Sequence, residues 1–145
     1  MNLSDHFTLE ELTASELADR HGIDNKPTDP SVIDNLKTLA EGLERVRTLL
    51  NKPILINSAY RCLPVNQLLG SKPTSQHTKG LAADIICPAF GSPSGIIKKI
   101  VSSTIEYDQV ILEFDRWIHI SFAEEGKAPR KQALIINKSG TRQYR

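Results

Sequence analysis

The sequence predicts an α+β domain in which helices come first and a small antiparallel sheet follows, with the N-terminal helices packed on it. One long stretch, from Ile33 to Leu50, repeats its apolar residues at helical spacing. Later apolar runs are short, and two of them, 109–114 and 117–122, are joined closely enough to form a hairpin. Helices followed by hairpin-linked strands are typical of the α+β class. The 145 residues, with 39% hydrophobic content, suit one domain, residues 1–145.

Capping signals predict two short helical turns before the long helix. In residues 7–12, Thr8 is a suitable N-cap because a glutamate follows three residues later. Residues 13–16 begin a second such turn. The long helix follows a break rich in proline and aspartate, and we expect Pro53 to end it because proline cannot continue a helix.

The rest of the chain is expected to contain short strands, loops and one more helix. The polar stretch 64–79 predicts mostly loop with one helical turn, and residues 94–103 predict a helix. The inner face of that helix should carry Ile96, Ile97, Ile100 and Val101. The tail, residues 126–145, has six lysines and arginines and no acidic residue, so we expect a solvated edge with one strand. The expected strands are 54–56, 81–86, 109–114, 117–122 and 133–136.

Bulk properties exclude several classes of partner. The formal net charge is only +1, whereas nucleic-acid-binding domains usually carry a strong basic excess, so no nucleic-acid partner is expected. The N-terminus lacks the basic and apolar segments of a secretory signal, and no apolar run could span a bilayer. We therefore expect a monomer made in the cytoplasm, without membrane insertion. Cys62 and Cys87 lack redox or zinc-site spacing and are interpreted as small buried residues, with a disulfide between them left open.

A histidine and a carboxylate, His77 and Asp84, lie seven residues apart around Gly80. On a continuous helix this spacing separates them by about 10 Å along the axis, and on a straight strand by roughly 23 Å. Two ligands of one zinc ion must each approach it within about 2 Å, so the chain has to turn between them. Gly80 permits such a turn because it adopts positive φ without a Cβ clash. A metal would also compensate the cost of a carboxylate inside so apolar a strand.

His119 is the expected third ligand. In the strand 117–122, period-two alternation places Ile118, Ile120 and Phe122 on the core face and His119 on the other face. Two histidines and one carboxylate leave zinc an open fourth position, as in catalytic rather than structural sites. One divalent metal ion is therefore expected, and Zn²⁺ is the ion that such ligands generally prefer.

At Ser75–Asp84, Trp117–Ile120 and Ser58–Arg61 the chain resembles the M15-type D-Ala-D-Ala carboxypeptidases and related phage endolysins. The family's S-x-H-x-x-G-x-A-x-D motif is matched by Ser75, His77, Gly80, Ala82 and Asp84. Trp117-Ile118-His119-Ile120 is similar to its W-x-H ligand strand, and Ser58-Ala59-Tyr60-Arg61 to its S-x-Y-R segment. The resemblance spans about residues 54–122 and implies the fold shared by these peptidases and the hedgehog signalling domain.

The resemblance implies zinc-dependent hydrolysis of a peptide bond in peptidoglycan stem peptides, of the D-Ala-D-Ala carboxypeptidase or L-Ala-D-Glu endopeptidase type. Many members keep a glutamate as general base three residues before the last histidine, and this chain has Arg116 there. Glu113 is the preferred base and Asp115 the reserve. Glu113 shares a face with His119 only if the connecting loop has an odd number of residues.

Arg61 is expected to hold the terminal carboxylate of the substrate or to polarise the scissile carbonyl. Ser75 and Gln76 would add hydrogen bonds to the substrate. The absence of a signal peptide favours a phage or prophage lysis protein, released through a holin or carried in the virion. The alternative is a non-catalytic, zinc-stabilised wall-binding or virion structural module, which would need no general base.

Overall fold

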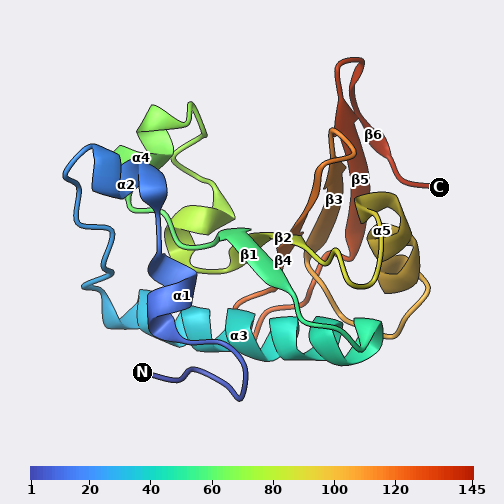
Figure 1. Ribbon diagram of the computed structural model, residues 1–145, viewed down its shortest axis with the longest axis horizontal. Helices are drawn as coiled ribbons and strands as arrows, with labels where there is room; N and C mark the ends of the chain where they lie inside the picture. The colour runs from blue at the N-terminus through green and yellow to red at the C-terminus, as the bar shows by residue number, and fades with distance from the viewer.

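A six-stranded mixed sheet forms the centre of the computed structural model, which describes residues 1–145 (Figure 1). The strand order is β1-β2-β4-β3-β5-β6. The strands are β1 (Leu55–Ser58), β2 (Ala82–Ile86), β3 (Gln109–Glu113), β4 (Trp117–Ser121), β5 (Gln132–Asn137) and β6 (Gly140–Gln143). The α+β class is confirmed.

The sheet was expected to be antiparallel, but β5 pairs with β3 in parallel, so the sheet is mixed. Both the end of β4 and the start of β5 lie beside Gln109, at the same end of the sheet. The short connection from residue 122 to 131 can therefore cross the end of β3 and enter β5 in the parallel direction. All other strand pairs are antiparallel.

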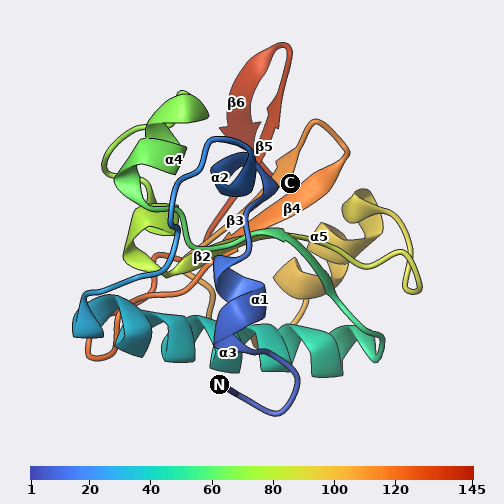
Figure 2. The same ribbon diagram turned by 60° about the vertical axis from the view of Figure 1, so that its left-hand side comes forward.

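Five α-helices and one 3₁₀ turn accompany the sheet: α1 (Leu9–Thr13), α2 (Glu16–Arg20), α3 (Pro30–Leu50), α4 (Leu63–Leu68), η1 (Gln76–Lys79) and α5 (Pro93–Val101). Thr8 caps α1 as predicted, accepting a hydrogen bond from the Glu11 amide at 3.0 Å. Figure 2 shows α3 running beneath the sheet, with α1 standing on it. α3 ends at Leu50 and Asn51 follows it in the left-handed conformation with φ 54°, so the helix stops before Pro53 as predicted.

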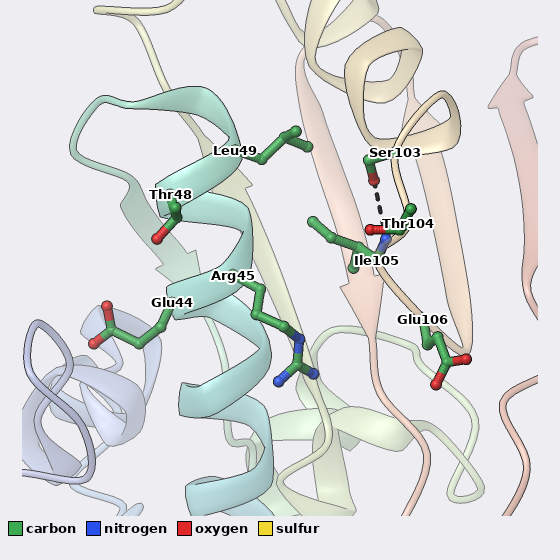
Figure 3. Close-up of a pocket in the computed structure, with 8 residues that line it drawn as sticks. All are labelled: Glu44, Arg45, Thr48, Leu49, Ser103, Thr104, Ile105 and Glu106. Atoms are coloured by element: carbon green, nitrogen blue, oxygen red, sulfur yellow. Dashed lines mark hydrogen bonds between the residues drawn. The ribbon is translucent and has the colours of Figure 1, made fainter.

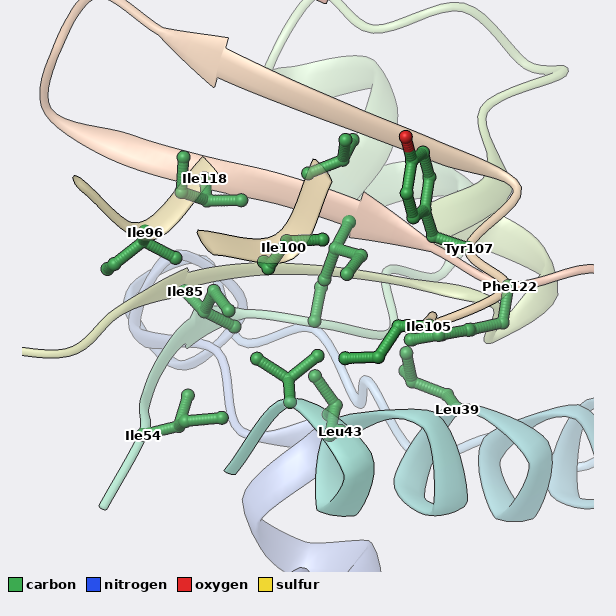
Figure 4. Packing of buried hydrophobic residues seen from close by; sticks show 14 of the residues in the cluster. Leu39, Leu43, Ile54, Ile85, Ile96, Ile100, Ile105, Tyr107, Ile118 and Phe122 are labelled. Atoms are coloured by element: carbon green, nitrogen blue, oxygen red, sulfur yellow. The ribbon is translucent and has the colours of Figure 1, made fainter. Parts of the chain in front are cut away.

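The hydrophobic core lies between α3, α5 and one face of the sheet (Figure 4). Helical spacing on α3 supplies Leu36, Leu39, Leu43, Val46 and Leu50. Facing strands supply Ile85, Ile118 and Ile120, and α5 supplies Ile96, Ile97 and Ile100. Val101 was expected on this face but is 36% exposed, because it is the last residue of α5 and lies about 90° from the centre of the face that Ile96, Ile97 and Ile100 form.

Two segments hold more regular structure than the sequence indicated. The stretch 64–79 contains both α4 and η1, and the tail contains β6 in addition to β5. Every residue of β6 is exposed, so it has no apolar alternation. Cys62 and Cys87 are both free thiols, so they form no disulfide. None of the helices is long and apolar enough to cross a membrane.

Candidate metal centre

The face of the sheet opposite the core carries a row of polar side chains. Asp84 on β2 pairs directly with His119 on β4, and Ser58 on β1 pairs with Asp84 from the other side. Directly paired residues project to the same face of a sheet. His119 thus emerges beside Asp84, while its neighbours Ile118 and Ile120 are fully buried in the core, which confirms the predicted alternation.

His77 reaches this row from the 3₁₀ turn η1. Ser75 caps the turn by accepting a 3.3 Å hydrogen bond from the His77 amide, and Gly80 closes it with φ 79°. The chain therefore turns between His77 and Asp84 at the glycine, as the spacing predicted.

The two imidazoles converge on one oxygen of Asp84. His77 Nε2 lies 3.3 Å and His119 Nδ1 3.2 Å from Asp84 Oδ1, and one ligand atom from each residue lies within 4.8 Å of the others. The side chains are only 4%, 11% and 11% exposed for His77, Asp84 and His119. These three predicted ligands are thus brought together in a nearly dry site.

Neighbouring groups orient two of these ligands. His77 Nδ1 lies 2.7 Å from the Ala59 carbonyl oxygen, which can only accept, so Nδ1 carries the proton and Nε2 keeps its lone pair. Arg61 donates from Nη2 to Asp84 Oδ2 at 3.0 Å and from Nε to Ser58 Oγ at 3.1 Å. One carboxylate oxygen is therefore held by Arg61 and the other faces the histidines.

The protonation states at this site favour a bound cation. Burial lowers the pKa of His77 despite the nearby Asp84 charge, so the imidazole is neutral. Asp84 is ionised, because it forms an ion pair with Arg61 at 3.0 Å. A neutral Nε2 and a carboxylate oxygen, both acceptors, then face each other at 3.3 Å. A divalent cation between them satisfies both, and two nitrogens with one oxygen suit zinc.

Glu113 lies on the same face as His119. The β3–β4 turn consists of Phe114, Asp115 and Arg116, an odd number, and Glu113 pairs with Trp117. Burial and the negative charge of Asp84 raise the pKa of Glu113, while His119 and Arg61 oppose that rise. Asp115 is exposed in the turn with φ 56° and is not brought to this group.

The side chains of Ser75 and Gln76 make contacts within the protein. Ser75 caps η1, and Gln76 donates from Nε2 to Asp108 Oδ2 at 3.0 Å. Arg130 donates to the same oxygen from Nε and Nη2, at 3.1 and 2.8 Å. Asp108 thereby links the tail to the turn that carries His77, a role that no local sequence pattern indicated.

A hollow of about 740 Å³, separate from this group, opens between α3 and the segment after α5. Figure 3 shows Arg45 and Leu49 on one side of it and Ser103, hydrogen-bonded to the Ile105 amide, on the other. Its lining includes no residue of the metal group, so it offers no metal chemistry of its own.

A family model described as Peptidase M15 matches residues 5–121. The matched range includes His77, Asp84, His119 and Glu113 and ends before β5 begins. No curated protein matches the chain.

Proposed function

The chain belongs to the peptidase M15 family, and on that premise we propose that it is a zinc peptidase acting on peptidoglycan stem peptides. His77, Asp84 and His119 would hold the ion. The observation that carries the proposal is the pair of acceptors, His77 Nε2 and Asp84 Oδ1, facing each other in a nearly dry site with His119 beside them. Without a cation this arrangement leaves buried lone pairs opposed.

A bound zinc ion supplies Lewis-acid activation, polarising the scissile carbonyl and lowering the pKa of water to about 7. The remaining chemistry belongs to the protein. Glu113, on the His119 face, would take a proton from the attacking water on a carboxylate oxygen and pass it to the leaving amine. Its raised pKa brings it closer to neutral pH, where a general acid–base is most effective.

Arg61 would act mainly by holding Asp84. Two of its nitrogens, Nη2 and Nε, are engaged with Asp84 and Ser58. Its Nη1 group makes no hydrogen bond within the protein and would be available to a substrate oxygen. The carboxylate orientation and the substrate contact thus come from one rigid guanidinium.

The motif resemblance supports a peptidoglycan substrate and the fold shared with hedgehog domains. It favours cleavage of a D-Ala-D-Ala or an L-Ala-D-Glu bond, for cell-wall lysis by a phage or prophage. A non-catalytic zinc-stabilised module would also need the three ligands. The presence of Glu113 on the ligand face favours catalysis, because a binding module has no use for a base there.

Mass spectrometry of the products released from purified peptidoglycan tests the proposal. The zinc-loaded protein should release a peptide with a new terminus, and chelator or His77→Ala should abolish its release. Glu113→Gln should bind zinc yet lower kcat by about 10²- to 10⁴-fold, while the exposed Glu125→Gln serves as matched control. Zinc binding without cleavage of several wall chemotypes would overturn the enzyme and leave the binding module.

A further inference from the structure

A second hollow lies where the two hairpin turns meet. Its volume is about 340 Å³, and it is lined by Phe114, Asp115, Arg116, Trp117, Asn137 and Lys138. Parallel pairing of β3 with β5 brings the turns together, and the Phe114 amide donates to the Ile136 carbonyl at 2.9 Å. We call this hollow the turn cavity.

The turn cavity adjoins the metal centre through Trp117. Trp117 lies two residues before His119 on β4, about 7 Å along the strand, and projects to the same face. It is also paired with Glu113 across the hairpin. A peptide lying over Glu113 and His119 would therefore meet Trp117, which also lines the turn cavity.

The charged residues of the turn cavity have no partners in the protein. Arg116 and Lys138 form no salt bridge, and neither does Asp115. All three are exposed. Two cations and one carboxylate leave a net charge of +1 in the lining, so the turn cavity favours an anionic ligand.

The aromatic residues of the turn cavity are placed for contact rather than for folding. Phe114 is 45% exposed and its ring centroid lies 6.2 Å from that of Trp117. Phe114 has a positive φ of 54°, a conformation that glycine, asparagine and aspartate adopt more easily than a bulky aromatic residue. The Trp117 Nε1 group is buried and has no hydrogen-bond partner. A strained, exposed aromatic beside an unpaired buried donor indicates a ligand contact.

We propose that the turn cavity is a substrate subsite that binds a free carboxylate on the peptide chain other than its C-terminal carboxylate. The inference rests on the proposed peptidase function. Arg116 and Lys138 pair with the carboxylate, and Phe114 and Trp117 pack against the aliphatic part of the residue that carries it. A γ-linked D-glutamyl residue of a stem peptide has such a carboxylate, which amidation to D-isoglutamine removes.

Two peptides that differ only in this amidation test the subsite. The probes are L-Ala-γ-D-Glu-L-Lys-D-Ala-D-Ala and its D-isoglutaminyl counterpart, assayed with zinc-loaded protein. The double variant Arg116→Gln, Lys138→Gln should raise KM for the free carboxylate by about tenfold and for the amidated peptide by less than about twofold. Arg142→Gln, which removes an exposed charge outside the turn cavity, is the matched control and should change neither KM.

Binding can be followed without turnover through the fluorescence of Trp117, which is the single tryptophan of the chain. Titrating zinc-loaded Glu113→Gln protein should show weaker binding of the amidated peptide, and the double variant in that background should abolish the difference. Removing the negative charge by Asp115→Asn should tighten binding of the free carboxylate only.

Equal effects of the double variant on both peptides, or no effect on either, would overturn the subsite. Failure of the proposed function has a different signature. In that case the wild-type protein cleaves neither peptide, and the fluorescence titration still reports whether the turn cavity discriminates the carboxylate from the amide.

Discussion

Replacing Gly80 by alanine should weaken both the fold and the metal site. Gly80 has φ 79°, which an L side chain rarely adopts. An added Cβ would lie 3.0 Å from Leu36 Cγ and 3.1 Å from the Val32 carbonyl oxygen. The carbonyl belongs to α3, so it cannot move aside without bending that helix.

Gly22→Ala separates the cost of the left-handed conformation from the cost of the close Cβ contacts. Gly22 has φ 64°, but an added Cβ there meets nothing within 4 Å. Gly22→Ala should therefore lower the free energy of unfolding only by the cost of placing alanine in the left-handed conformation, about 1–2 kcal/mol. Gly80→Ala should lose about 1 kcal/mol or more beyond that, because crowding a packed site typically costs about 1–3 kcal/mol.

Urea denaturation of zinc-free protein at pH 7 measures the free energies of unfolding, and competition with a chelator measures zinc affinity. Because Gly80 closes the turn that carries His77, Gly80→Ala should also weaken zinc binding by about tenfold or more. Gly22→Ala should leave zinc affinity unchanged. Equal losses of unfolding free energy in the two variants, or wild-type zinc affinity in Gly80→Ala, would refute this reasoning.

Three further predictions concern side chains around the site. Arg61→Lys keeps the charge but cannot reproduce both hydrogen bonds of the guanidinium. Zinc affinity measured by calorimetry should therefore fall about 10- to 100-fold. An unchanged affinity would show that Asp84 does not need Arg61 to orient it. Asp108→Asn should cost about 1–2 kcal/mol of unfolding free energy at pH 7, at the lower end because the side chain of its partner is 55% exposed. Hydrogen bonds outweigh burial and lower the pKa of Asp108 in the folded state. The stabilisation is therefore complete above the unfolded pKa near 3.9 and is lost as the pH falls further. Urea titrations that show as large a difference between Asp108→Asn and wild type in acid as at pH 7 would contradict this prediction. Glu113→Gln should lower kcat by about 100-fold or more, and Asp115→Asn should lower it by far less. The reverse order would indicate that Asp115 is the general base.

The three proposed ligands could be found from the sequence because their placement depends on local rules. Strand alternation alone placed His119 on the face away from the core, and the structure pairs it directly with Asp84. The seven-residue spacing required a turn, and Gly80 was the residue able to make it. Both inferences need only the geometry of one strand or one turn.

The proposed base could be assigned only conditionally, because the length of the β3–β4 turn was not readable. The turn contains two residues with positive φ, Phe114 and Asp115, and the first of them is not one of the glycine, asparagine and aspartate residues that usually mark such positions. Without that signal, a two-residue and a three-residue loop were equally compatible with the sequence. One residue of difference moves Glu113 to the opposite face of the sheet.

Contacts between distant segments were beyond the sequence for a different reason. The link from Gln76 through Asp108 to Arg130 joins a turn, a strand start and the tail. No periodicity or capping rule relates residues so far apart. The parallel pairing of β5 with β3 was hidden in the same way, since it depends on which end of the sheet the connection crosses.

The basic tail was expected to be a solvated edge, but it also contacts the elements that carry the proposed base and the proposed ligand His77. Its first strand, β5, pairs along the whole of β3, the strand that carries Glu113. Arg130 fixes Asp108, which in turn holds the residue before His77. Lys138 contributes one of the two cations of the turn cavity. The family match ends at residue 121, so the segment beyond it, which supports both the proposed base and a proposed ligand, is where this chain can differ in substrate preference while keeping the same metal chemistry.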